Sequence, residues 1–405
     1  MGPAESGRIT VVGAGPVGLT VAYFLARNGI EVQVLEAGTV PSTEWRASTF
    51  HPPTLELYDS IGVADDMLAG GLPARHYQIR DRRAGLVAEF DLDVLRQDTR
   101  YPFRLQYEQY KLVQLLRERL DDAPNATICF AHEFLDVAQD PAGVTATVRT
   151  PAGVRTITVP YLLGADGANS AVRRQLGLAF DGLTYVDRYL LLSTTFPFER
   201  HMTDIRLVNY IADPEEHMML LRIPDVWRVL FSVRPGEEGL ALTEPEGERR
   251  LQRVVAHPEP FPVLQRQLYQ IHQRVASTFR SGRVLLLGDA AHVNSPFGGM
   301  GLNSGVHDAF DLGARLVLVL EDRAPADEEL SAYATARRRV ATDHVRAQTH
   351  RNTRSLAERD PAVRAEHQAE MAAIAADPER ARTWLLDASM ITAVREQGIG
   401  GGYRY

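Results

Sequence analysis

The chain has 405 residues, of which 45% are hydrophobic and 24% charged. This length exceeds one ordinary core and fits about two to three domains of a soluble globular protein. The formal net charge is −8, so no basic surplus exists to neutralise phosphates, which argues against a nucleic-acid partner.

Cysteine usage and hydropathy indicate the compartment. Cys129 is the only cysteine of the sequence, so no disulfide can form within the chain, as is usual in a reducing cytoplasm. The N-terminal residues lack the apolar core of a signal peptide. No run approaches the ~18 apolar residues that a membrane helix needs. We therefore expect a cytoplasmic protein with no membrane partner.

The first predicted elements form a strand–helix–strand unit. Arg8 to Val12 has the pattern of a short buried strand, Leu19 to Asn28 that of a helix, and Glu31 to Leu35 that of a second strand. Gly29 stands where a helix commonly stops. A unit of this kind implies parallel strands.

The next elements are more varied. Prolines 52 and 53 open a helical pattern, and the sequence then predicts a hairpin at Tyr77 to Phe90, an amphipathic helix at Gln109 to Leu120, a three-stranded meander at Thr127 to Val159 and a strand at Tyr161 to Ala165.

The pattern changes after residue 184. Four strand-like runs follow without a crossover helix, which favours a mostly antiparallel sheet: Leu190 to Thr195, Ile205 to Ile211, His217 to Ile223 and Trp227 to Val233. The sequence then predicts a helix at Arg249 to His257, a buried strand at Arg283 to Leu287, a long helix at Asn303 to Leu320, and a helix-rich segment after Ala326.

A glycine motif stands between the first strand and helix. In Gly13-x-Gly15-x-x-Gly18, the first glycine allows a tight turn, the second lets the backbone approach a pyrophosphate, and the third lets helix and strand pack closely. The helix N-terminus then presents N–H groups to the phosphates. Glu36, at the end of the second strand, can accept ribose hydroxyls. This motif alone does not separate FAD from NAD.

Two later motifs narrow the cofactor. Leu163-Gly-Ala-Asp166-Gly follows a strand and opens a helix, and Leu287-Gly-Asp289-Ala-Ala-His292 precedes a glycine-rich loop at 298–305. Asp289 can accept a hydroxyl of a ribityl chain, and the glycines allow backbone to approach a flat ring. The helix that begins near Leu302 directs N–H groups at that ring, which suits the negative charge of a reduced flavin.

The three motifs in this order resemble the FAD-dependent aromatic hydroxylases, class A flavoprotein monooxygenases similar to p-hydroxybenzoate hydroxylase. The resemblance runs from about Arg8 to Leu320. It adds Arg46, near the flavin and pyrophosphate, and Gln106, near the ribityl chain or flavin. The cofactor-binding residues that it implies are Gly13, Gly15, Pro16, Val17, Gly18, Glu36, Arg46, Gln106, Asp166, Asp289, Gly301, Leu302 and Asn303. No metal ligand is assigned.

For catalysis the resemblance implies Pro296, whose carbonyl faces the substrate, and Tyr210, which precedes Asp-Pro as a substrate-facing tyrosine does in the family. Arg222 could pair a substrate carboxylate, and His51 could lie near the flavin. Each of these residues could instead be structural. Further residues with either a binding or a structural reading are Ser170, Arg173, His217, His292 and Asp308.

The resemblance implies one reaction cycle. NAD(P)H, a transient co-substrate without its own nucleotide domain, reduces FAD; O2 adds to form a flavin hydroperoxide; and the distal oxygen hydroxylates a phenolic or N-heteroaromatic ring. A related reductase or dehydrogenase without oxygen insertion stays open, as does a non-catalytic flavin-binding protein. A halogenase is disfavoured, because no tryptophans are paired and Lys111 is the only lysine.

The expected fold is α/β plus α+β: a Rossmann-like FAD-binding domain, an inserted mostly antiparallel-sheet substrate domain and a helical C-terminal segment. We expect a discontinuous FAD-binding domain at residues 1–75, 100–183 and 281–325, and a substrate domain at 76–99 and 184–280. The segment 326–405 packs on the core or helps to form a homodimer.

Overall fold

The structure is a computed structural model that describes residues 8–41 and 45–397. Its N-terminal unit contains strand β1 (Ile9–Val12), helix α1 (Pro16–Arg27) and strand β2 (Val32–Leu35). The two strands pair in parallel, as the sequence predicts. They lie inside a six-stranded sheet with the order β18-β19-β12-β1-β2-β8, in which all pairs are parallel except β18–β19. The added strands are β8 (Ala126–Cys129), β12 (Leu162–Gly164), β18 (Arg280–Ser281) and β19 (Val284–Leu286).

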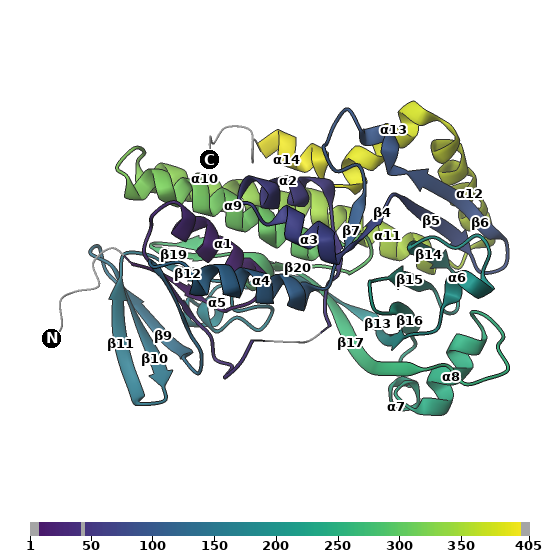
Figure 1. Ribbon diagram of the computed structural model, residues 1–405, viewed down its shortest axis with the longest axis horizontal. Helices are drawn as coiled ribbons and strands as arrows, with labels where there is room; N and C mark the ends of the chain where they lie inside the picture. The colour runs from purple at the N-terminus through teal and green to yellow at the C-terminus, as the bar shows by residue number, and fades with distance from the viewer. Residues whose placement is uncertain (1–7, 42–44, 398–405) are drawn as a thin grey trace.

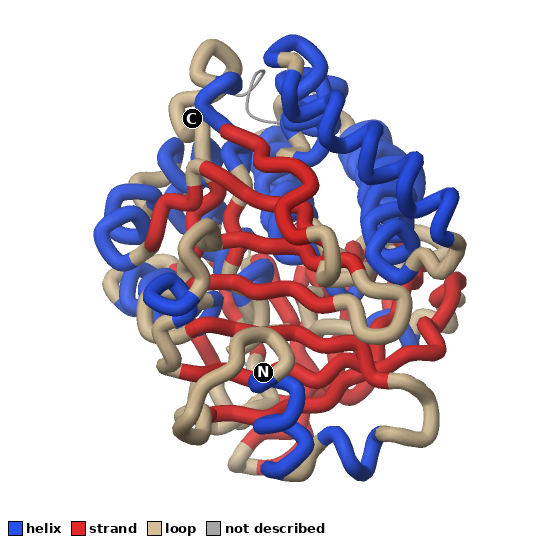
Figure 2. The backbone as a smooth tube through the Cα atoms, turned by 90° about the vertical axis from the view of Figure 1, so that its right-hand side faces the viewer, coloured by secondary structure: helices blue, strands red, loops and turns tan. Residues whose placement is uncertain are grey.

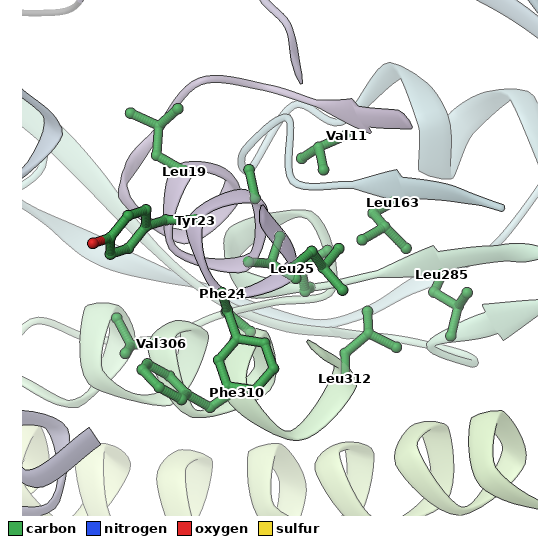
Figure 3. Packing of buried hydrophobic residues seen from close by; sticks show 14 of the residues in the cluster. Val11, Leu19, Tyr23, Phe24, Leu25, Leu163, Leu285, Val306, Phe310 and Leu312 are labelled. Atoms are coloured by element: carbon green, nitrogen blue, oxygen red, sulfur yellow. The ribbon is translucent and has the colours of Figure 1, made fainter. Parts of the chain in front are cut away.

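Helices cover this sheet because its central strands are buried on both faces. Helix α1 packs against α9 (Met300–Leu320), and the rings of Phe24 and Phe310 meet edge to face with centroids 5.4 Å apart. Figure 3 shows these rings between the two helices, with Val11 and Leu163 on the neighbouring strands. On the other side α1 contacts α4 (Gln109–Asp121). The contact between α1 and α9 joins the two ends of the cofactor region predicted from sequence.

A separate antiparallel sheet stands at one end of the molecule (Figure 1). Its strands are β9 (Glu133–Gln139), β10 (Val144–Thr150) and β11 (Gly153–Val159). The predicted three-stranded meander therefore exists, but it begins at Glu133 rather than at Thr127. Residues 127–129 belong to β8 and pair with β2 in the parallel sheet.

The largest sheet has eight strands in the order β20-β17-β13-β16-β15-β14-β5-β6. All its pairs are antiparallel except β14–β5, which agrees with the mostly antiparallel prediction. Figure 2 shows the strands lying across the molecule. Their bounds are β5 (His76–Asp81), β6 (Gly85–Asp91), β13 (Phe180–Thr194), β14 (Val208–Ala212), β15 (Met218–Arg222), β16 (Trp227–Val233), β17 (Val263–Ala276) and β20 (His292–Val293).

The two faces of this sheet have different coverings. One face packs under α6 (Phe198–His201), α7 (Glu238–Ala241) and α8 (Glu244–Gln252), with Leu220 and Phe231 in its core. The other face carries Tyr189 and Met219 and packs against Phe297 and the C-terminal helices. Because strand side chains alternate between faces, the parity of a residue decides whether it can reach the cofactor side.

Short elements connect the sheets. Strands β3 (Thr49–Phe50), β7 (Arg104–Gln106) and β4 (Leu72–Ala74) form a small antiparallel sheet. The remaining connecting elements are α2 (Pro52–Ser60), α3 (Ala64–Gly70), α5 (Ala171–Gln175) and the 3₁₀ turns η1 (Leu92–Leu95) and η2 (Gly288–Ala290).

The C-terminal segment is helical as far as it is described. It contains α10 (Ala326–Val340), a π-helical stretch η3 (Ala341–Arg346), α11 (Ala347–Ala357), α12 (Pro361–Ala376), α13 (Pro378–Ala388) and α14 (Ile391–Gln397).

This segment packs on the large sheet rather than standing apart. Figure 1 shows α12 and α13 beside β6. Asp81 accepts hydrogen bonds from Arg364 and Gln368 of α12, and Trp384 Nε1 donates to Tyr77 Oη at 2.7 Å. Of the helices in the described part of the chain, none is both long and apolar enough to span a bilayer.

Candidate active site

The glycine loop has the geometry that its three glycines predict. Gly13 has a φ of +106°, and a Cβ on it would lie 2.5 Å from the carbonyl oxygen of Ala165. A Cβ on Gly18 would lie 2.0 Å from the Gly13 oxygen. By contrast, a Cβ on Gly15 meets no protein atom within 4 Å. Gly13 and Gly18 are therefore glycines because of the fold, whereas Gly15 leaves open space beside the N-terminus of α1.

Residues around this loop are held by backbone contacts. Pro16 begins α1, and no side chain caps its N-terminus. The side chain of Val17 fills the space between Gly288 and Gly305. Glu36 accepts hydrogen bonds from Ala14 N and Gly38 N, both at 2.8 Å. These bonds orient the Glu36 carboxylate at the rim of the loop and leave it lone pairs for hydroxyl groups.

The Asp166 motif forms a compact turn. Ser170 Oγ donates to Asp166 at 2.5 Å and accepts from Arg173 N at 2.9 Å. Arg173 donates to the carbonyl oxygen of Ala290 at 2.7 Å, which ties this turn to the Asp289 motif. The contacts of Ser170 and Arg173 are those of a helix cap and a brace.

Asp289 and Arg46 act on one another electrostatically. Asp289 lies in η2 with its side chain accessible to solvent. Protein nevertheless surrounds much of the carboxyl group, and the resulting desolvation raises its pKa, while the charges of His292 and Arg46 oppose that shift. His292 Nε2 donates to the carboxylate of Asp308 at 2.8 Å, and this buried carboxylate also accepts from Gly288 N and Arg337. His292 and Asp308 therefore have structural contacts.

The loop before α9 is pinned by Asn303. This buried side chain donates to Thr49 O at 2.8 Å and to Gly299 O at 2.6 Å, and accepts from His51 N at 2.8 Å. Gly299 is the N-cap of α9 with a φ of +69°, and no side chain caps this helix end. Its N-terminal N–H groups are thus presented from a rigid loop. Gly301 and Leu302 in this first turn are partly accessible.

His51 holds the same loop through a hydrogen bond to its backbone. Its Nε2 lies 2.8 Å from the carbonyl oxygen of Gly298, an acceptor, so Nε2 carries the proton. Burial lowers the pKa of His51 to about 3, and the charge of Arg104 adds to this shift. A buried, neutral imidazole in this place positions the loop, which is a different role from the direct catalysis that the sequence left open.

Pro296 begins the loop, and its carbonyl oxygen accepts from Gly299 N at 3.0 Å. The next residue, Phe297, is buried against the rings of Tyr189 and His217, with centroids 5.4 and 5.7 Å away. His217 Nε2 lies 2.9 Å from Tyr189 Oη. These three rings form a wall between the loop and the large sheet.

Tyr210 lies on the same sheet face as this wall. It pairs with Met219 across β14 and β15, and directly paired residues share a face. Arg104 donates from Nη1 to Tyr210 Oη at 3.3 Å, and its guanidinium carbon lies 4.3 Å from the centroid of the Tyr77 ring. The sequence interpretation missed both Arg104 and Tyr77.

Arg222 does not join this group, and we correct its assignment. Leu221 pairs with Val208 on the face of Tyr210, so the next residue points to the opposite face, with Leu220. Arg222 there donates to the carbonyl oxygen of Ile223 at 2.8 Å. The sequence pattern identifies the strand but not the register that decides its parity.

Several features fit a bound FAD. Gln106 is buried, its Oε1 accepts from Thr49 Oγ1 at 2.9 Å, and its Nε2 donor has no protein partner among the described residues. Three further features belong to the segments for which the sequence predicts cofactor contacts. They are the space at Gly15, the uncapped N-termini of α1 and α9, and the accessible carboxylate of Asp289. Gln106 Nε2 and the N–H groups of the two helix ends therefore need a ligand or solvent to complete their hydrogen bonds.

Comparisons with known proteins agree with this arrangement. The model of a family described as "FAD binding domain" matches residues 7–348. Para-nitrophenol 4-monooxygenase of Pseudomonas sp. is 33% identical over 96% of both chains. The 6-hydroxy-3-succinoylpyridine 3-monooxygenase of Pseudomonas putida is 33% identical over 87% of this chain and 90% of its own. The 6-methylpretetramide 4-monooxygenase of Streptomyces rimosus is also 33% identical, but the chain spans only 59% of it.

Solved structures give the same result. The crystal structure of p-nitrophenol 4-monooxygenase from Pseudomonas putida superposes with a TM-score of 0.89 at 32% identity, covering 98% of this chain and 100% of the other. A flavin-dependent monooxygenase in complex with FAD and substrate has a TM-score of 0.79 at 26% identity, covering 100% of this chain and 75% of its own. The chain belongs to the FAD-dependent aromatic hydroxylases and is a single-component FAD-dependent aromatic monooxygenase with NAD(P)H as co-substrate.

Proposed function

We propose that the substrate of this monooxygenase is a small monocyclic phenol. The observation that carries the proposal is the similarity along the entire chain to para-nitrophenol 4-monooxygenase. The 6-methylpretetramide 4-monooxygenase is matched over only 59% of its length. Two polar side chains could receive a phenol: Tyr210, on the face of the large sheet that packs against Phe297, and Arg104 of β7, which donates to the Tyr210 hydroxyl group.

We also propose roles for the cofactor-binding residues. The N-terminus of α1, with Gly15 at its cap, would hold the pyrophosphate, and Glu36 the adenosine ribose. Arg46 and Asp289 would lie at the pyrophosphate and ribityl chain, and Asp166 would brace the turn beside them. The remaining proposed contacts of the flavin ring are Gln106, Gly301, Leu302 and Asn303.

The overall reaction balances with one aromatic C–H bond replaced by C–O. NAD(P)H supplies two electrons, one atom of O2 enters the ring, and the other leaves as water. Bound FAD supplies the hydride-accepting and oxygen-activating chemistry. The residues of the chain would orient the ring and keep water out. Phe297, Tyr189 and His217 suit the second role because they are buried and pack together.

Substrate-stimulated turnover tests the proposal. The purified holoenzyme is mixed with NAD(P)H and a panel of phenols, benzoates and N-heteroaromatic acids, and NAD(P)H consumption and hydrogen peroxide release are followed together. A small phenol should accelerate consumption with little peroxide. Acceleration only by a larger or non-phenolic compound would refute the substrate class. Release of one peroxide per NAD(P)H with every compound would favour a reductase that inserts no oxygen.

Three further expectations remain proposals. We propose the discontinuous FAD-binding domain and the substrate domain with the bounds given in the sequence analysis. Residues 398–405 of the C-terminal segment lie outside the described residues. A homodimer is tested by light scattering of the holoenzyme. The single cysteine supports the proposal of a cytoplasmic location, which fractionation of the native cell tests.

A further inference from the structure

Arg104 is a buried cation that has no counter-ion among the described residues. Its residue is 2% exposed, and among the described residues it forms no ion pair with a carboxylate. Its one protein hydrogen bond runs from Nη1 to Tyr210 Oη at 3.3 Å. Nε is buried and has no hydrogen-bond partner in the described part of the chain. A buried guanidinium normally has its charge paired or its donors satisfied, because desolvation is costly otherwise.

The other buried arginines of the described chain have carboxylates or backbone carbonyl oxygens as hydrogen-bond partners, although Nε of Arg228 also lacks a partner there. Arg250 pairs with Glu216 and Glu246. Arg337 pairs with Asp308. Arg173 and Arg228, which are also buried, donate to backbone carbonyl oxygens.

Arg104 differs from these arginines, since its partners among the described residues are a phenol oxygen and an aromatic face, with neither a carboxylate nor a carbonyl oxygen. The Tyr77 ring attracts the guanidinium but cannot neutralise it.

The position of Arg104 points its unsatisfied donors toward the cofactor side. Arg104 and Gln106 stand two residues apart on β7, so their side chains share one face. Gln106 Nε2 is the other donor on this face that lacks a partner among the described residues. Strand β7 pairs with β3, which leads into His51 under the Gly298 carbonyl.

We propose that Arg104 binds the anionic oxygen of the substrate, so that the phenol is held as its phenolate. The unpartnered Nε and the neighbouring Nη2 form one side of the guanidinium fork, and this side can recognise such an oxygen. This inference rests on the proposed function and adds a specificity-determining residue to it. A phenolate is more electron-rich than a phenol, so holding the substrate in this form also prepares the ring for oxygen transfer.

The groups that face Arg104 would not compete with a phenolate. Tyr77 on β5 and Tyr210 on β14 present phenolic hydroxyl groups to Arg104. Burial raises the pKa of Tyr77 to about 12, so this group carries no negative charge at neutral pH. His51, before α2, is neutral because burial and the Arg104 charge lower its pKa. Trp384 of α13 donates to Tyr77 Oη and holds that ring under the guanidinium. No anion among these residues occupies the place of the ligand.

The test is equilibrium binding to the FAD-loaded protein without NAD(P)H. Wild type and Arg104→Met are titrated with 4-nitrophenol over a pH series, and difference absorbance reports whether the bound ligand is phenol or phenolate. Nitrobenzene is the uncharged probe of the same ring size. Arg119→Met, which removes a half-exposed arginine paired with Asp66, is the matched control.

We expect wild type to bind phenolate at pH values below the solution pKa of the ligand. Arg104→Met should raise the Kd of 4-nitrophenolate at least tenfold and move the pKa of the bound ligand upward. The Kd for nitrobenzene should change less than twofold, and Arg119→Met should match wild type in all respects.

Equal weakening of both ligands by Arg104→Met would show a packing role and overturn the inference, as would no weakening of either. If Arg104→Met does not retain FAD, Arg104→Lys keeps the charge and should still bind phenolate; binding of the neutral phenol alone would overturn the proposal. A wild type that binds no phenol refutes the proposed function together with this inference. A wild type that binds phenol, with an unchanged Arg104→Met, refutes only the inference.

Discussion

Replacing Gly15 with alanine separates a ligand requirement from a folding requirement. Gly15 has a φ of −75° and a ψ of 178°, a conformation open to any residue, and its added Cβ meets no protein atom within 4 Å. The loss of backbone freedom in the unfolded chain stabilises by about 0.4–1 kcal/mol, and the poorer helix cap costs a similar amount. The free energy of unfolding of the apoprotein should therefore change by less than about 1 kcal/mol.

The same methyl group enters the space proposed for the pyrophosphate. We expect the Kd for FAD to rise at least tenfold, about 1.4 kcal/mol, because the phosphates can no longer approach the backbone N–H groups closely. Apoprotein unfolding in urea gives the stability, and quenching of flavin fluorescence on titration gives the Kd.

Two substitutions bracket this experiment. Gly18→Ala places a Cβ 2.0 Å from a backbone oxygen and should destabilise the apoprotein by several kcal/mol, about 3 or more. Gly239→Ala adds a methyl group to open space in α7; it should leave the Kd for FAD unchanged and stabilise the apoprotein by at most about 1 kcal/mol. The reasoning is refuted if Gly15→Ala binds FAD as tightly as wild type, or if its apoprotein loses as much stability as Gly18→Ala.

Further predictions concern the loop, the pH dependence and the C-terminal helices. Asn303→Leu removes three hydrogen bonds and should cost about 3 kcal/mol in urea unfolding, with reduced FAD affinity; an unchanged midpoint would contradict the pinning role. The folded pKa of His51 is lowered to about 3, so the unfolded chain binds more protons than the folded one below about pH 6.5, and stability should fall as the pH drops from there toward 3. His51→Gln should reduce that slope by up to one proton, and an identical slope would show that His51 is not the titrating group. Trp384→Phe removes the hydrogen bond to Tyr77 and should raise the KM for the phenol with little change in FAD affinity; a loss of FAD instead would contradict a role on the substrate side.

Local patterns made much of the fold predictable. The βαβ unit and the long helix before residue 320 follow from contiguous apolar runs bounded by glycines, which act within a few residues. Strand β17 was missed because its sequence is rich in glutamine and arginine and most of its first half is not buried. Its pairing with β13 through twelve residue pairs is a long-range interaction that no local pattern reports.

The candidate site also contains residues that local motifs predict and residues that depend on long-range strand pairing. Gly13, Glu36 and Asp289 stand in motifs whose spacing reflects local geometry, so their neighbourhood could be anticipated. Arg222 was misplaced because the face of a strand residue depends on register, and the register of β15 appears only when β14 pairs with it. Arg104 was missed because a three-residue strand leaves no period to read, although its place two residues before Gln106 implies a shared face.

Oxygen incorporation tests the central claim most directly. The holoenzyme is supplied with NAD(P)H, isotopically labelled O2 and the phenol that most accelerates NAD(P)H consumption, and the aromatic product is analysed by mass spectrometry. The account predicts a product that carries one labelled oxygen per ring, formed in proportion to the NAD(P)H consumed. A product without label, accompanied by labelled hydrogen peroxide in the amount of NAD(P)H consumed, would contradict it.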